Sequence, residues 1–153
     1  MATPEERLAE LGITLGEPPA PAAAYVPTVQ TGSLLYTAGQ VATADGRLVA
    51  SGVVGDDVDL DTGVACARAC AVNVLAQLKA ALGDLSRVRR VVKLTVFVAS
   101  APTFTSQHLV ANGASELLAE VFGDAGRHAR SAVGVASLPT GSPVEVEAIV
   151  EVA

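Results

Sequence analysis

The nine residues from Val144 to Val152 alternate between two kinds of side chain, and this pattern constrains the fold more than any other segment. Val144, Val146, Ala148 and Val150 form one set, and the positions between them form the other: Glu145, Glu147, Ile149 and Glu151. In a strand, alternate side chains point to opposite faces of the sheet. The first set fits a core under helices, while the second must meet water, a ligand or another subunit. The sequence therefore predicts a sheet covered on one face only.

Two long segments carry the helical pattern that would cover this sheet. The first ends at Leu82, before the stop residue Gly83, and its apolar stripe recurs at steps of three and four residues: Ala67, Ala71, Leu75, Leu78 and Leu82. The second is expected from Phe104 to Phe122, with Gly123 closing it. Near the N-terminus, Thr3-Pro4 is typical of a helix start before Glu5 to Leu11. Residues 1–19 are thus expected to form a short helix and an extended lead-in.

The remaining apolar segments predict strands and one clear hairpin. Ala44-Asp45-Gly46 has the chemistry of a tight hairpin turn. Val92, Leu94, Val96 and Val98 alternate as one face of a long strand. The expected strands are Val26–Gln30, Leu34–Thr43, Arg47–Ala50, Val88–Ala99, Ser131–Ser137 and Val144–Val152. The order of strands, helix, strand, helix and two strands predicts a single α+β domain over residues 1–153, with both helices on one sheet face.

Composition excludes several classes of protein. The chain carries 16 acidic and 10 basic residues for a formal charge of -6, which disfavours nucleic-acid binding, and its 3% aromatic content offers few stacking platforms. No apolar run approaches the ~18 residues of a membrane helix, and the N-terminus resembles no signal peptide. Two cysteines do not make a disulfide framework. We therefore expect a cytoplasmic protein with no membrane partner.

Arg130 and Glu145 are the candidate catalytic residues in the last two strands. Arg130 is followed at alternate positions only by small residues, which leaves room for a bound anion beside its guanidinium. The alternative is an ion pair with Glu145 or Glu147 across the sheet. Glu145 is a candidate base that orients water, and a solvated strand face is the alternative.

Other titratable residues carry weaker signals. Cys66 and Cys70 lie one helical turn apart, but without further ligands we expect buried thiols and no metal site. His128 stands two residues before Arg130, so it either lines the same pocket or makes a backbone contact at the start of the strand. A basic cluster in the acidic chain either binds an anionic partner or is solvated: Arg87, Arg89, Arg90 and Lys93.

Several segments, taken in order, resemble the RidA/YjgF family. Arg130-Ser131-Ala132-Val133, Leu138-Pro139 and Val144-Glu145-Val146-Glu147-Ala148-Ile149 resemble its C-terminal signature. Upstream, Tyr25-Val26, Ala38-Gly39-Gln40 and Val92 to Val98 resemble further family segments. The likeness covers about residues 20 to 153, and the spacing of the last two strands is its most specific part.

The resemblance implies a chorismate-mutase-like α+β fold, with a mixed sheet, and a homotrimer. In that family the uncovered sheet faces form a central barrel and the clefts between subunits form three sites. Well-studied members hydrolyse enamines and imines such as 2-aminoacrylate to 2-keto acids and ammonia, without a cofactor. The family arginine that binds the substrate carboxylate falls on Arg130 and its water-orienting glutamate on Glu145. A cleft tyrosine falls on Tyr25, and an asparagine of the second helix on Asn112.

The chain also departs from the family pattern near these positions. The common cysteine two residues after the arginine is Ala132, and His128 replaces the proline that usually precedes the strand motif. Together with the extra N-terminal helix, these departures indicate a longer branch of the family.

These observations lead to three functional hypotheses. The first is a trimeric hydrolase of small 2-imino acids, in which Arg130 and Glu145 are catalytic and the substrate-binding residues are Tyr25, Asn112, Ala132 and His128. The second is a non-catalytic trimer that binds a small carboxylate metabolite in the same cleft. The third, endoribonuclease activity, is disfavoured by the net acidity and the few aromatic residues.

Overall fold

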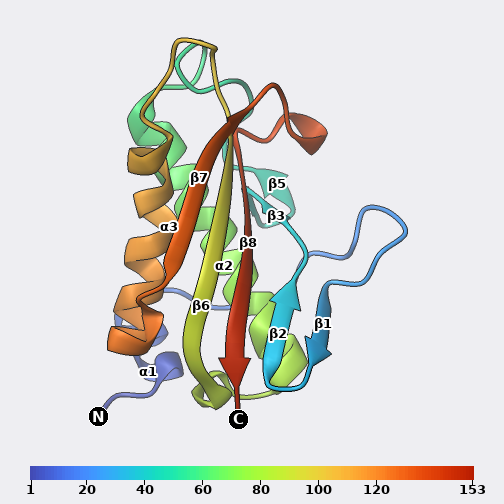
Figure 1. The fold of residues 1–153 in the computed structure, drawn as a ribbon, viewed down its shortest axis with the longest axis vertical. Coiled ribbons are helices and arrows are strands. Elements are labelled where there is room, and N and C mark those ends of the chain that lie inside the picture. The colour runs from blue at the N-terminus through green and yellow to red at the C-terminus, as the bar shows by residue number, and fades with distance from the viewer.

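Six strands form one mixed sheet, and the computed structural model describes all of residues 1–153. The order across the sheet is β1-β2-β8-β6-β7, and β3 pairs with β8 beyond the end of β2 (Figure 1). Only β6 and β7 are parallel, with α3 in the crossover between them. The strands are β1 (Thr28–Thr31), β2 (Leu34–Thr37), β3 (Gln40–Val41), β6 (Val88–Ala99), β7 (Ala129–Val135) and β8 (Val144–Val152), and a separate hairpin is formed by β4 (Thr43–Ala44) and β5 (Arg47–Leu48).

Two long helices, α2 (Leu60–Leu82) and α3 (Gln107–Phe122), cover one face of this sheet, as predicted (Figure 1). The apolar stripe of α2 is buried against the sheet and α3, and Gly83 ends the helix with a positive φ. The short helix α1 (Pro4–Glu10) begins with a capping box between Thr3 and Glu6. Single 3-10 turns follow α2, α3 and β7, at Leu85–Arg87, Gly123–Gly126 and Pro139–Gly141. The α+β class with helices on one sheet face is confirmed.

The alternation along β8 fixes which face is covered. Its valines and Ala148 are buried in the core, whereas Glu145, Glu147, Ile149 and Glu151 are only partly buried on the other face. The last strand thus separates the core from an open sheet face, as its sequence indicates.

The segment predicted as one strand, Leu34–Thr43, is broken into three short strands. β2 pairs Tyr36 with Ile149, but β3 pairs Gln40 with Val146, so one extra residue lies on this side of the ladder. At this point in the ladder the amide of Ala148 donates a hydrogen bond to the side-chain hydroxyl of Thr37, 3.0 Å away. This extra residue forms a β-bulge, which the side-chain pattern of Leu34–Thr43 does not indicate by itself.

The boundaries of the other strands and of α3 differ from the predicted ones by a few residues. β1 begins at Thr28, after Pro27, which has no N–H for the ladder. A register shift in β6 buries Val91 in place of Val92, so the prediction that Val92 shares a face with Leu94 is wrong. α3 begins at Gln107 rather than Phe104. β7 begins at Ala129 and so includes Arg130.

The helix α2 is long and apolar enough to cross a membrane by length and composition, contrary to the expectation that no such run exists. Half of its most apolar window is buried within the fold, as in the core helix of a soluble protein. Its hydropathy therefore reflects packing between the sheet and α3.

Close packing of α2 on α3 makes Gly113 a sensitive position for stability. A Cβ atom at Gly113 would overlap the backbone carbonyl of Val64 on α2. We expect Gly113→Ala to lower the free energy of unfolding by about 1–3 kcal/mol, because backbone must move to relieve the overlap. Urea denaturation measures this, with Gly16→Ala as the control, since nothing lies near a Cβ built at Gly16. Equal stability of the two variants would contradict this helix packing.

Candidate functional site

Arg130 lies on the edge strand β7 and is held by helix α3. In the register with β6 it pairs with the buried Leu94, so its side chain lies on the helix side of the sheet. One terminal nitrogen donates to Asn112 Oδ1 at 2.9 Å and to Ser115 Oγ at 3.1 Å, and the other donates to the carbonyl of His108 at 3.1 Å. The alternative prediction of an ion pair with Glu145 or Glu147 is wrong, because both carboxylates lie on the opposite sheet face.

The guanidinium of Arg130 keeps free donors for a ligand. A guanidinium has five N–H groups, and the three hydrogen bonds to α3 leave one on Nε and one on Nη2. Nε and Nη2 flank one edge of the planar group, and two donors on such an edge match the two oxygens of a carboxylate. The α3 contacts fix the orientation of that edge, and Arg130 remains partly exposed. Arg130 is therefore held in one orientation by α3 and keeps unused donors, an arrangement suited to a carboxylate ligand.

His128 supports this arrangement through Ser115. His128 Nδ1 lies 2.6 Å from the carbonyl of Gly126, which can only accept, so Nδ1 carries the proton. Nε2 then accepts from the hydroxyl of Ser115 at 2.9 Å, and the same hydroxyl oxygen accepts from Arg130. Burial, and then the charge of Arg130, lower the pKa of His128. Both ring nitrogens are thus occupied, and His128 positions Ser115 beside Arg130.

The lowered pKa of His128 predicts how stability depends on pH. In the unfolded chain the imidazole of His128 takes up a proton at about pH 6.5, the ordinary pKa of histidine. In the folded chain it takes up the proton only at a lower pH. The contribution of His128 to stability is complete above pH 6.5 and is lost as the pH falls through the folded pKa. We expect unfolding free energy to fall more between pH 7 and 5 in the wild type than in His128→Gln. His108→Gln is the control, and an equal pH dependence in wild type and His128→Gln would contradict the network.

Glu145 lies at a different place, on the open face of β8. It lines a cavity of about 110 Å³ with Tyr25, Gly39 and Thr140. A Cβ atom at Gly39 would overlap the Glu145 carboxylate, so the bulge between β2 and β3 brings glycine backbone against this carboxyl group. Burial, and then the negative charge of Glu147, raise the pKa of Glu145. A half-buried carboxyl group with a raised pKa is suited to moving protons near neutral pH.

Tyr25 lies in the loop before β1, with 48% of its surface exposed. Its hydroxyl accepts a hydrogen bond from the amide of Ala22 at 3.3 Å, which orients the ring along the lead-in. Ala132 is on β7, on the helix side like Arg130, and packs against the core.

The structure thus divides the predicted site residues into two groups within one chain. The Arg130 group contains Asn112, His128 and Arg130 with Ser115, and the Glu145 group contains Tyr25 and Glu145. Arg130 and Glu145 lie on opposite faces of the sheet. Their backbones are two strands apart, about 10 Å, and are offset by three residues along the strand, about a further 10 Å. The two groups therefore lie apart within one chain, and we call them the Arg130 and Glu145 half-sites.

The cysteines and Arg87, which lie outside these two groups, make structural contacts. The thiols of Cys66 and Cys70 are free and buried, burial raises both of their pKa values, and Cys70 donates to the carbonyl of Val144. No group of three or more potential metal-ligating side chains occurs. In the basic cluster, Arg87 donates to the carbonyls of Leu82 and Ala153 and so ties down the C-terminus.

Ser115 is the residue of this site that sequence reasoning missed. It stands one helical turn after Asn112, on the side of α3 that faces β7. That spacing places the two side chains on one helix face, and it is the signal that could have identified Ser115.

Comparisons with known proteins agree with the order of motifs. The family model described as "YjgF/chorismate_mutase-like, putative endoribonuclease" matches residues 5–152. Protein TCP17 of Trypanosoma cruzi is 53% identical over 145 residues, which are 94% of this chain and 91% of that protein. The crystal structure of Atu1372 from Agrobacterium tumefaciens is 54% identical, with a TM-score of 0.92 over 98% of this chain and 92% of that one.

More distant structures share the fold with a lower superposition score. TdcF of E. coli, solved with bound serine, is 27% identical with a TM-score of 0.62, covering 92% of this chain and 96% of its own. Atu1372 has the higher TM-score of the two, 0.92 against 0.62. The family model spans nearly the whole chain, and the relatives named YjgF and RidA share its fold. The chain therefore belongs to the YjgF/chorismate mutase-like family, the RidA/YjgF family that its sequence motifs resemble.

Proposed function

We propose that the chain is a homotrimeric hydrolase of small 2-imino acids, acting on 2-aminoacrylate-type enamines and their imine tautomers. The observation that carries the proposal is the free edge of the Arg130 guanidinium, whose two N–H groups match a carboxylate. A 2-imino acid presents a carboxylate beside its reactive C=N carbon. Serine bound to the relative TdcF is likewise a small carboxylate-bearing metabolite.

The two half-sites fit a cleft between neighbouring subunits. Arg130 lies on an edge strand, and Glu145 lies on the open sheet face, so each can face a second chain. That open face also exposes Tyr36 on β2 and Val133 on β7, apolar surface that a neighbouring subunit would cover. In the proposed trimer, Arg130 of one subunit lies opposite Glu145 of the next.

The reaction needs water, a base and a place to hold the carboxylate. Arg130 binds the carboxylate and so fixes the imine carbon. The Glu145 carboxylate accepts a proton from the attacking water as the C–O bond forms. It passes that proton to the imine nitrogen, which gives the carbinolamine. It then takes the proton of the carbinolamine hydroxyl and delivers it to the amino nitrogen as the C–N bond breaks, giving a 2-keto acid and ammonia. Tyr25 and Asn112 border the cleft, and Ala132 leaves the space that the family cysteine occupies elsewhere.

Ammonia release from freshly generated 2-aminoacrylate tests this function directly. We expect the protein to accelerate release above the spontaneous rate, and to leave a neutral imine without a carboxylate unaffected. Tight binding of 2-keto acids without turnover would instead support a non-catalytic metabolite binder. A parallel RNA-cleavage assay tests the endoribonuclease alternative, for which we expect no activity. We place the reaction in the cytoplasm, because a pair of free thiols one helical turn apart suits a reducing compartment.

A further inference from the structure

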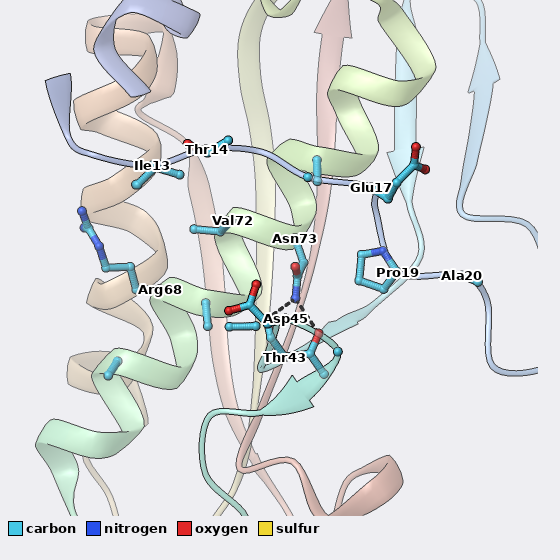
Figure 2. A pocket seen from close by; sticks show the side chains of 16 residues that line it. Ile13, Thr14, Glu17, Pro19, Ala20, Thr43, Asp45, Arg68, Val72 and Asn73 are labelled. Carbon is cyan, nitrogen blue, oxygen red and sulfur yellow. Dashed lines mark hydrogen bonds between the residues drawn. The ribbon is translucent and has the colours of Figure 1, made fainter. Parts of the chain in front are cut away.

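A second cavity, of about 840 Å³, lies on the outer side of helix α2 (Figure 2). The lead-in from Ile13 to Ala20 crosses one side of it, and the turn of the β4–β5 hairpin borders the other. None of Arg130, Glu145 or Tyr25 lines this cavity. Its only connection with the smaller Glu145 cavity is a shared wall at Pro19, Ala20 and Thr43. The cavity is thus separate from the proposed catalytic groups.

The cavity is held open by small side chains and by a fixed lead-in. Ala65, Ala69 and Ala76 on α2 line it and fill little of the space. The side chain of Gln77 donates to the carbonyl of Pro19 at 2.9 Å, which ties the lead-in to the helix. The wall of the cavity is therefore part of the packed fold.

Asn73 places a hydrogen-bond acceptor that has no protein partner at this cavity. Its Nδ2 donates to the carbonyls of Val41 and Thr43 and to the hydroxyl of Thr43, each at 3.0 Å. The two carbonyls accept only, which fixes the amide orientation and leaves Oδ1 without a protein partner. Asn73 is only 9% exposed, and no fully buried side-chain nitrogen or oxygen in the structure lacks a hydrogen-bond partner. Because Asn73 lines the cavity, Oδ1 must be accessible from it.

The charges around the cavity favour a cationic ligand. Asp45 sits at the hairpin turn with a φ of 53°, followed by Gly46 with a φ of 75°, and Figure 2 shows it near Asn73 at this end of the cavity. Its carboxylate makes no ion pair. Arg68, the one basic residue in the lining, lies 3.6 Å from Glu120. Glu17 at the lead-in adds a further negative charge.

We propose that this cavity binds a small organic cation, a primary ammonium or amidinium group on an apolar body. The cationic head donates hydrogen bonds to Asn73 Oδ1 and to the Asp45 carboxylate. The apolar body lies on Ile13, Ala69 and Val72. An anionic ligand of the same shape would meet the Asp45 carboxylate and the Asn73 acceptor at this end of the cavity, so we expect it to bind more weakly than the cation.

Titration of isotope-labelled protein with benzamidine and benzoate tests the proposal, because the two probes share a ring and differ in head-group charge. We expect benzamidine alone to shift the side-chain amide signal of Asn73 and the methyl signals of Ala69 and Ala76. Asp45→Asn should weaken benzamidine binding about three- to tenfold, as expected for loss of one partly exposed charge-assisted contact. Asp56→Asn, an exposed carboxylate in another loop, is the control and should leave the affinity unchanged.

A second variant and a second readout separate this site from the proposed reaction. Ala69→Leu should occupy the place of the apolar body and reduce the shifts, while imine hydrolysis continues in both the Asp45 and the Ala69 variants. Equal binding of benzoate, shifts confined to residues around Glu145, or an unchanged affinity in Asp45→Asn would each overturn the proposal. These outcomes do not depend on whether the chain hydrolyses imines.

Discussion

Replacing Arg130 by alanine should lower kcat/KM for 2-aminoacrylate hydrolysis about 10²- to 10³-fold, one of the two largest effects that we expect from single substitutions. The free edge of Arg130 is the only feature of its half-site that matches a carboxylate, and loss of one partner of such a charge-assisted pair costs about 2–5 kcal/mol. Arg130→Lys should recover only part of the activity, since an ammonium keeps the charge but lacks the planar fork.

Arg127→Ala is the matched control for this prediction. Arg127 lies three residues before Arg130, and its side chain is largely exposed beside Asp124. Its removal should leave kcat/KM near the wild-type value. Full activity in Arg130→Ala, measured by the same ammonia-release assay, would contradict the assigned carboxylate contact.

Glu145→Gln should reduce kcat by about 10²- to 10⁴-fold, the range usual for loss of a general acid–base group. Glutamine keeps the size and hydrogen-bonding capacity of the side chain but cannot accept a proton from water. The pKa of Glu145 is raised, so in the wild type activity should fall as the pH drops through a value above that of an ordinary glutamate.

Glu147→Gln is the control on the same strand face. It should retain most of the activity, and the acid limb of its pH–rate profile should move to lower pH. The direction follows because the charge of Glu147 is one of the two causes that raise the pKa of Glu145. An unchanged rate in Glu145→Gln, or an acid limb that moves to higher pH in Glu147→Gln, would contradict the role of Glu145.

The covered and open faces of the sheet could be predicted from sequence because their signal is local. The alternation along Val144–Val152 and the apolar stripe of the long helix each reflect contact with one continuous core. The strand interruption after Thr37 could not be predicted in this way. It depends on a side-chain hydroxyl replacing a ladder hydrogen bond to Ala148, which lies more than 100 residues away in sequence.

The sequence motifs single out the candidate residues but do not predict how they are arranged. Arg130 and Glu145 are recognisable from their strand motifs, yet the motifs do not say that the two side chains lie on opposite faces of one sheet. That result depends on the registers in which β7 and β8 each pair with the intervening strand β6. The role of His128 was also undetermined, because its two ring contacts involve Gly126 and Ser115, and Ser115 comes from a different element.

Mixing two inactive variants tests most directly whether catalysis uses a site shared between subunits. Arg130→Ala and Glu145→Gln each destroy one half-site and leave the other intact. In randomly mixed trimers, about a quarter of the clefts would pair an intact Arg130 with an intact Glu145 from the neighbouring subunit. We predict that co-expressed or co-refolded variants recover about that fraction of the wild-type rate of ammonia release. Mixtures that remain as inactive as either variant alone, although size analysis shows mixed oligomers, would contradict the shared site.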